Sequence, residues 1–422
     1  MSKPLDYENS KAVLRYLDAN IRFQLGARCP YISNTERQVP LWIDLLKFDE
    51  TRNQNPRITV NRVDYVIGTF RSYPEGPIPI VHQEENSRGG VATDLDAFGA
   101  EDYSADNGSQ PGDVVVTDPR IQVQMDRQQI ARREELVRAL REILSLHRRR
   151  RQGGTVFVGN PQDRRIVERA RSWSKERLET YIDRMETPLL PVYCRRRGEE
   201  RRFETLGQVT VGPLVRRLRG RLNEVEKKLT TCLFGDRPTI FVRRLHLGRP
   251  HMILRLPGSF NLRIRELKAI NEMDIVTKAI SSFVTPSPLN YLETNDLDPD
   301  NRMLGAALRV KVTRIDEDSF ERLQGVRNLH LEVGRMDVEP GDLARLLRTP
   351  KPVGTTWRMG IREEETLIEA MRILEEEIEG CRREDRSLTF RMNGETESRI
   401  SYERTQGRVQ WMLKWKVLEI IE

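Results

Sequence analysis

The sequence predicts an α+β fold in which helical and β-rich stretches follow one another along a chain of 422 residues. Three observations lead to this prediction. Short amphipathic helices open the chain, runs rich in β-branched and aromatic residues follow Pro40, and strand-like and helix-like pieces alternate after Thr239. A chain of this length is long enough for two or three domains, each with a hydrophobic core.

Changes in composition divide the chain into four parts. We expect a small helical segment over 1–40, an antiparallel β subdomain over 41–118, an arginine-rich helical region over 119–235 and a strand-helix domain over 236–422. The net charge of +7 favours solubility and attraction to acidic partners, but it does not define a fold.

The first forty residues predict helices from Tyr7 or Glu8 to Leu17 and from Ile21 to Arg28, followed by a short turn that Ser33 and Glu36 cap. Such a unit is too small to bury a core alone, so it must pack on the rest of the chain or on a partner. The apolar residues that would form a docking face are Leu5, Val13, Leu14, Leu17 and Ile21.

Leu41–Phe48 and Arg57–Tyr73 predict the antiparallel sheet, and an acidic loop covers 83–118. Asp94 and Asp96 resemble the start of a calcium-binding loop. Phe98 and Ala105 then fall where that loop needs oxygen ligands, so we expect the carboxylates to cap turns instead.

The arginine-rich region predicts a long helix that begins near Ile121 and ends in Arg148–Arg151, and two further helices over Gln162–Met185 and Val211–Leu233. These arginines either neutralise the acidic loop or a protein partner, or they bind nucleic-acid phosphates. The second alternative lacks the interleaved aromatic residues on which single-stranded bases stack. The basic patch consists of Arg148, Arg149, Arg150, Arg151, Arg216 and Arg217.

After Thr239 the pattern is an irregular array of strands and helices. It is either leucine-rich-repeat-like, without a recurring Asn or Cys, or a βαβ sheet with a parallel core. A closing meander ends with Val409–Ile421. The strands that we expect are Ile240–Leu245, Met252–Leu256, Leu262–Leu267, Ala307–Val312, Leu329–Val333 and Thr355–Met359.

No motif for catalysis, phosphate binding or metal binding is present, so we expect a non-enzymatic protein without cofactor or metal. His246 and His251 flank a predicted turn and are expected to be exposed. The four scattered cysteines and the absence of a signal-peptide-like or membrane-spanning stretch favour a cytoplasmic or nuclear protein.

Several short motifs occur in the order found in a known family. They are Leu5-Asp6-Tyr7, Val13-Leu14, Tyr16-Leu17, Ile58-Thr59-Val60-Asn61, Pro111-Gly112-Asp113 and Leu254-Arg255-Leu256-Pro257. In these motifs the chain resembles an expanded nematode (Caenorhabditis-type) family with an F-box-like N-terminus followed by a domain of unknown function. The resemblance covers about 1–118 and, more loosely, 160–335.

The resemblance implies that 1–40 docks on a Skp-type adaptor of a ubiquitin ligase while the C-terminal half holds a target. Two positions depart from a general F-box. Leu5 is followed by Asp6 where an F-box has Leu-Pro, and Ala27-Arg28-Cys29-Pro30 replaces a Val-Cys-Lys-x-Trp stretch. A structural helical cap therefore remains the alternative for 1–40. The sequence favours a protein-interaction, target-recognition protein, with nucleic-acid binding through the arginine-rich helices as the competing hypothesis.

Overall fold

The structure of the chain is a computed structural model. It describes residues 7–51, 55–73, 78–96, 98–102, 110–115, 127–149, 160–197, 204–211, 214–218, 220–248, 253–269, 273–315, 317–393, 395–406 and 411–420.

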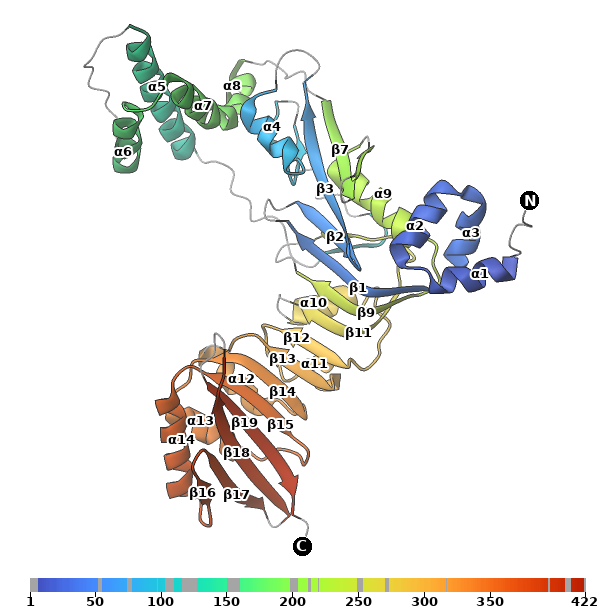
Figure 1. Cartoon of the computed structure of the whole chain (residues 1–422), viewed down its shortest axis with the longest axis vertical. Helices are drawn as coiled ribbons and strands as arrows, with labels where there is room; N and C mark the ends of the chain where they lie inside the picture. Colours follow the sequence, from blue (N-terminus) through green and yellow to red (C-terminus); the bar gives the residue numbers. More distant parts are fainter. Residues whose placement is uncertain are drawn as a thin grey trace.

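One mixed sheet of fifteen strands runs through the molecule (Figure 1), in the order β16-β17-β18-β19-β15-β14-β13-β12-β11-β9-β1-β2-β3-β7-β8. Its strands are β1 (Leu41–Glu50), β2 (Pro56–Val60), β3 (Val63–Ser72), β7 (Glu204–Val211), β8 (Leu214–Leu218), β9 (Ile240–Leu247), β11 (Leu262–Ala269), β12 (Tyr291–Thr294), β13 (Arg309–Val312), β14 (His330–Met336), β15 (Thr356–Ile361), β16 (Arg382–Glu384), β17 (Ser387–Asn393), β18 (Thr396–Arg404) and β19 (Trp411–Glu419). Two small sheets pair β6 (Asp113–Val115) with β10 (Ile253–Arg255) and β4 (Asp94–Leu95) with β5 (Glu101–Asp102).

Some helices lie against this sheet and others form separate groups (Figure 1). They are α1 (Tyr7–Tyr16), α2 (Ala19–Arg28), α3 (Pro30–Gln38), α4 (Ile80–Ser87), α5 (Arg127–Arg149), α6 (Pro161–Ala170), α7 (Lys175–Glu186), the 3₁₀ helix η2 (Thr187–Leu189), α8 (Leu190–Arg197), α9 (Leu222–Phe234), α10 (Met273–Ile280), α11 (Arg302–Ala306), α12 (Glu317–Gly325), α13 (Pro340–Arg348) and α14 (Glu364–Glu377). The prediction of mixed helix and strand is confirmed, and the division into four parts stays a prediction.

The centre of the sheet is a run of seven parallel strands, β1, β9 and β11 to β15. Their register aligns one buried residue from each strand: Leu46, Leu245, Leu267, Leu292, Val310, Leu331 and Trp357. The residue that follows each of these is exposed or half-buried. Alternation of this kind gives the sheet one apolar face and one polar face.

Helices α10 to α13 connect successive parallel strands that are also neighbours in the sheet. Because such connections share one hand, they place the helices on a single face of the sheet. The opposite face of the parallel strands carries the polar residues, and we call it the open face.

The sheet continues with antiparallel strands on both sides of the parallel run. On one side β1 pairs with β2, followed by β3, β7 and β8. On the other side β15 pairs with β19, followed by β18, β17 and β16. Strand β1 is therefore antiparallel to one neighbour and parallel to the other, which the sequence did not indicate.

Two hydrophobic cores lie in the described residues. The larger one extends between the sheet and its helices, from Ala19 to Val417. The second belongs to α5, α6 and α7, and consists of Leu136, Ala139, Leu140, Ile143, Val167, Ala170, Leu178 and Ile182. The helical group α5–α8 thus has apolar packing of its own.

Several predicted helices have different limits in the structure. The predicted helix Val211–Leu233 is wrong in its first half, where β7 and β8 form a hairpin before α9 begins at Leu222. Gly212, Pro213 and Gly220 in this stretch are poor helix residues, and β3 offers a free edge to β7.

The predicted helix Gln162–Met185 is divided into α6 and α7, because the Ser174 hydroxyl caps α7 by accepting a hydrogen bond from the Arg177 N–H at 3.3 Å. Helix α3 begins at Pro30, so Ser33 lies inside this helix rather than at its cap.

Candidate interaction surfaces

Helices α1–α3, the N-terminal helical unit, are fixed to the sheet by buried charged residues. Glu36 of α3 lies between two buried arginines. Arg22 of α2 donates from Nε to Glu36 Oε1 at 2.9 Å, and Arg237 donates from Nη2 to Glu36 Oε2 at 2.7 Å. Arg22 also donates to the carbonyls of Glu36, Val39 and Pro40, each at 2.8 Å. Because Arg237 follows α9, this network joins the N-terminal helical unit to a distant part of the chain.

A second set of buried polar contacts fixes the start of α2. Asn20 donates to the Val60 carbonyl at 2.9 Å and accepts from the Tyr65 hydroxyl at 2.9 Å. Asp18 caps α2 by accepting from the Asn20 N–H at 2.8 Å, and it also accepts from the Asn61 side chain at 2.7 Å. Asn61 has a φ of 55°, a value that asparagine tolerates in a turn. These contacts hold α2 against the β2–β3 hairpin.

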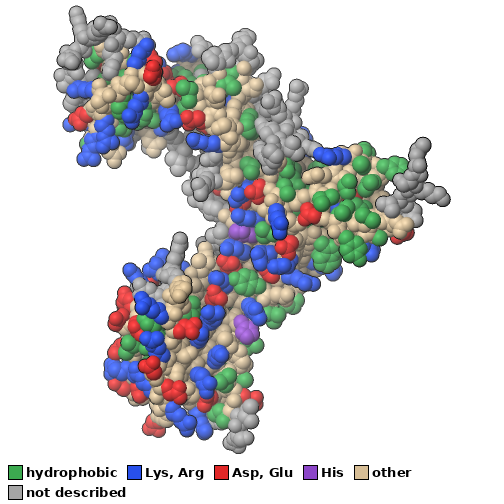
Figure 2. Space-filling view, in the orientation of Figure 1, with side chains coloured by type: hydrophobic (Ala, Val, Ile, Leu, Met, Phe, Trp, Pro, Cys, Tyr) green, Lys and Arg blue, Asp and Glu red, His purple; other side chains and the backbone are tan. Residues whose placement is uncertain are grey.

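The predicted docking residues fall in different environments. Leu14 is 3% exposed and packs inside, Leu17 is half-buried, and Val13 and Ile21 are 46% and 47% exposed. Leu5 lies outside the described residues. The exposed residues of this unit also include Tyr16 and Tyr31, at 91% and 98%. Figure 2 shows hydrophobic side chains gathered over α1–α3.

The predicted basic patch cannot be placed as side chains. Arg148 and Arg149 are in α5, Arg216 and Arg217 are in β8, and the side chains of all four lie outside the described part of the structure, as do Arg150 and Arg151 entirely. Two of the described arginines of α5 make ion pairs within the helical group. Arg132 contacts Asp163 at 2.7 Å and Arg141 contacts Glu186 at 2.6 Å.

The described carboxylates of 83–118 pair with several elements. Glu84 contacts Arg184 of α7 at 2.8 Å, and Asp113 contacts Lys227 at 2.8 Å and Arg255 at 2.6 Å. Asp96 accepts the N–H groups of Phe98 and Ala100 at 2.9 and 2.8 Å. Asp94 accepts the Leu222 N–H at 2.7 Å and so caps α9. Asp96 therefore caps a turn and Asp94 caps the start of a helix, which is the capping role that the sequence predicted for these carboxylates.

The open face of the parallel strands is rich in cations (Figure 2). The register aligns one row of side chains across it, composed of Lys47, His246, Lys268, Glu293, Lys311, Glu332 and Arg358. Neighbouring members of this row form ion pairs, Lys268 with Glu293 at 2.6 Å and Lys311 with Glu332 at 2.9 Å. Cations and carboxylates therefore alternate over β11 to β14.

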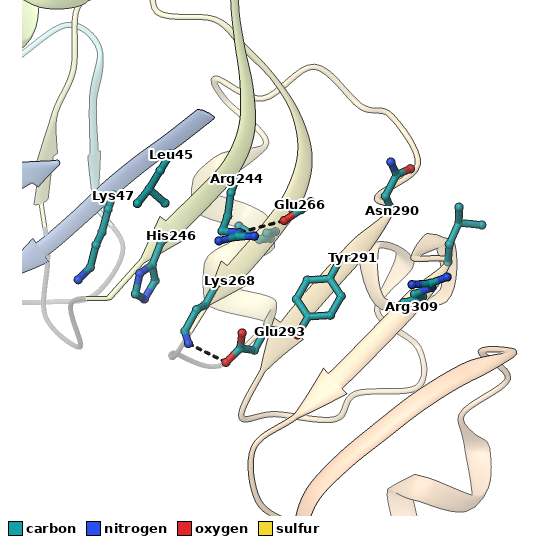
Figure 3. Close-up of a pocket in the computed structure, with 12 residues that line it drawn as sticks. Leu45, Lys47, Arg244, His246, Glu266, Lys268, Asn290, Tyr291, Glu293 and Arg309 are labelled. Atoms are coloured by element: carbon teal, nitrogen blue, oxygen red, sulfur yellow. Dashed lines mark hydrogen bonds and ion pairs between the residues drawn. The ribbon is translucent and has the colours of Figure 1, made fainter. Parts of the chain in front are cut away.

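The open face is hollowed where β1, β9, β11, β12 and β13 lie side by side (Figure 3). The hollow has a volume of about 880 Å³. Four cations line it, Lys47, Arg244, Lys268 and Arg309, with the carboxylates Glu266 and Glu293 and the apolar side chains Leu45, Tyr291 and Leu308. Arg244 pairs with Glu266 at 2.9 Å. The lining thus carries more positive than negative charge.

His246 lies in this hollow rather than in an exposed turn, so its predicted position was wrong. The ring is half-buried on β9, and its Nε2 atom is buried without a hydrogen-bond partner. Burial, with a smaller contribution from Lys47 and Lys268, lowers the pKa of His246 to about 4. The ring is therefore neutral at pH 7.

An aromatic pair lies beside the hollow, toward the start of β1 and β9. The rings of Trp42 and Phe241 stack with centroids 4.3 Å apart, and Trp42 is 56% exposed. The Arg263 guanidinium lies 5.8 Å from the Phe241 ring centroid. This part of the open face offers a flat apolar surface next to cations.

In the described ranges no group of three or more His, Cys, Asp and Glu residues is arranged to hold a metal ion. None of the helices in these ranges is long and apolar enough to cross a membrane. The four cysteines are free thiols.

The comparisons with known proteins identify one family match. Residues 221–363 match a family model described as "Domain of unknown function (DUF3557)". This stretch contains α9 and all the parallel strands except β1. The comparisons with curated proteins and with solved structures return no match. The prediction of a domain of unknown function is confirmed for 221–363, whereas the F-box-like N-terminus and the nematode family stay predictions.

The spacing of apolar residues in three of the strands is a sequence signal for the open face. Strands β9 and β11 share the spacing Leu/Ile-x-Val/Ile-x-x-Leu-x-Leu/Ala, and β1 has Leu41, Ile43, Leu46 and Phe48 at the same intervals. Two consecutive polar positions in the middle of this spacing place extra side chains on the open face. These strands line one hollow because β1 pairs with β9. Local sequence does not specify this pairing.

Proposed function

We propose that this protein is a non-enzymatic target-recognition protein, an F-box-like substrate receptor of a ubiquitin ligase. In this proposal the N-terminal helical unit docks on a Skp-type adaptor, and a leucine-rich-repeat-like strand-helix domain holds the target. The two surfaces lie on different elements, so both partners can be bound together.

The observation that carries the proposal is the exposure of Val13, Tyr16 and Ile21 on the N-terminal helical unit, whose helices α2 and α3 are anchored by buried hydrogen bonds. Exposed apolar residues that gather in one region are typical of protein-protein interfaces, where a few such side chains supply most of the binding energy. The ion pairs that Arg132 and Arg141 make within the helical group weaken the alternative of nucleic-acid binding through α5.

The test is capture of a recombinant Skp-type adaptor by the full-length chain. Because Val13, Tyr16 and Ile21 are exposed, changing all three to serine should leave the fold intact and lower capture at least tenfold. Gln24→Ala, at an exposed polar position of α2, is the control and should capture normally. No capture by the unmodified chain, or equal capture by the triple variant, contradicts the proposal.

A further inference from the structure

We infer that the hollow in the open face binds an acidic, extended peptide segment of the target, whose carboxylates contact Lys47, Lys268 and Arg309. The inference rests on the proposed function and names the chemistry of the partner that the strand-helix domain recognises.

Charge is the first argument. The four cations of the hollow exceed its two carboxylates, and Lys47 also pairs with Asp49 at 2.6 Å. Beside the hollow, Arg243, Arg263 and Arg265 exceed the single carboxylate Asp44, which pairs with Arg243 at 3.0 Å. Within the described residues Arg309 is exposed and forms no ion pair, so it can accept a ligand carboxylate without breaking an existing contact. A carboxylate is the ligand group that lysine and arginine bind most readily in proteins, apart from phosphate.

Spacing is the second argument. Lys47 and Lys268 occupy the same row on β1 and β11, with β9 between them. Two strand spacings amount to about 9.6 Å. Three residues of an extended chain span about 10 Å. A peptide that crosses the strands with acidic residues at every third position therefore matches the two lysines.

Alternation of charge distinguishes a peptide from a nucleic acid. Glu293 and Glu332 interrupt the row of cations at every second strand, between Lys268, Lys311 and Arg358. A continuous phosphate backbone would meet these carboxylates and be repelled. A peptide can place neutral or basic residues opposite them.

Apolar contacts complete the surface. Leu45 and Tyr291 lie in the hollow (Figure 3), and Trp42 stacked on Phe241 lies beside it. A partly apolar surface lets the same peptide bury hydrophobic side chains between its acidic residues.

The experiment measures fluorescence anisotropy of the full-length chain with two labelled fifteen-residue probes, five repeats of Gly-Ser-Glu and five repeats of Gly-Ser-Gln. We expect the Glu probe to bind at least tenfold more tightly in low salt, with the preference shrinking in high salt. Arg309→Gln should weaken Glu-probe binding at least threefold. The control is Lys278→Gln, at an exposed position of α10 on the opposite face of the sheet. It makes the same change in charge and should leave binding of the Glu probe unchanged.

Equal binding of the two probes overturns the inference, as does an equal loss in Arg309→Gln and Lys278→Gln. A single-stranded oligonucleotide that binds more tightly than the Glu probe, in a manner lost in Arg309→Gln, also overturns it in favour of nucleic acid. Adaptor capture is read separately. A chain that captures the adaptor without preferring the Glu probe loses this inference alone, and a chain with the preference but without capture loses the proposed adaptor docking.

Discussion

The N-terminal helical unit and the helical group α5–α8 are held in the molecule in different ways. Helix α2 packs on β1 of the sheet, whereas α7 packs on α4, which lies against β3. The first unit has few buried apolar residues of its own and depends on the buried network of Arg22, Glu36 and Arg237. The second encloses its own apolar core around Leu140. In its ion pairs with Asp163 and Glu186, the arginines Arg132 and Arg141 are exposed to solvent.

The difference shows how the length of a helical group determines what holds its helices in place. Three helices of about ten residues cannot enclose a core, so their position is fixed by specific buried hydrogen bonds to the sheet. The longer group folds on itself and needs few contacts with the sheet. The first unit should therefore be sensitive to the loss of a polar group, and the second to the loss of an apolar one.

The largest effect is expected from Glu36→Gln, which leaves the buried guanidiniums of Arg22 and Arg237 without a carboxylate. We expect a loss of about 3–5 kcal/mol in the free energy of unfolding, the usual cost of an uncompensated buried charge. Denaturant unfolding gives the size, and hydrogen exchange should show α1–α3 losing protection first. Glu8→Gln, at an exposed carboxylate of α1, should leave the unfolding midpoint unchanged. A change below about 1 kcal/mol in Glu36→Gln would contradict the role of this network.

Leu140→Ala should destabilise the chain by about 2–5 kcal/mol through the cavity it creates. Since Leu140 belongs to the separate core, the loss should be confined to α5–α8. Hydrogen exchange measured by mass spectrometry should show faster exchange in α5 and α7 and normal exchange in β9 to β15. Faster exchange throughout the sheet would show that the two cores unfold together.

Lys351 is a buried cation that, within the described ranges, pairs with no carboxylate. Its Nζ donates to the carbonyls of Gln324 and Val326 at 2.8 and 2.9 Å, and it lies 4.5 Å from the Trp357 ring centroid. Burial, followed by the charge of Arg327, lowers its pKa to about 8. Between that value and the ordinary 10.5 the unfolded chain binds more protons, so stability should rise with pH over this window.

The measurement is the free energy of unfolding of the unmodified chain minus that of Lys351→Met, followed from pH 7 to pH 11. The difference should rise by about 1–3 kcal/mol and then level off, as expected for a shift of this size. Because the other groups titrate equally in both proteins, their contributions cancel in the difference between the two free energies of unfolding. A flat difference would show that the two carbonyls and the indole ring hold the ammonium without cost.

The smallest effect is expected from Arg141→Gln, which removes an exposed ion pair with Glu186. Pairs of this kind contribute less than about 1 kcal/mol and weaken in salt. Thermal unfolding in low and high salt should give nearly equal midpoints for the variant and the unmodified chain. A larger loss would mean that ion pairs, and not only the core, hold α5–α8 together.

The sequence indicated most of the strands because their apolar residues alternate clearly, as in Leu262, Ile264 and Leu267 of β11. It missed β12 and α11, which contain four and five residues, too few to show a period. It identified the exposed Val13 and Ile21 but could not tell that Leu14, next to Val13, turns inward. Neither the Glu36 network nor the hollow could be predicted, because each joins residues that are far apart along the chain.

The outermost strand β16 has a consequence for how copies of this protein behave together. It contains only Arg382, Arg383 and Glu384, all charged and all exposed. A strand this short offers few backbone N–H and C=O groups to a strand of a second molecule. Its exposed charged side chains also disfavour edge-to-edge pairing. Pairing of copies of this wide sheet through the β16 edge is therefore disfavoured.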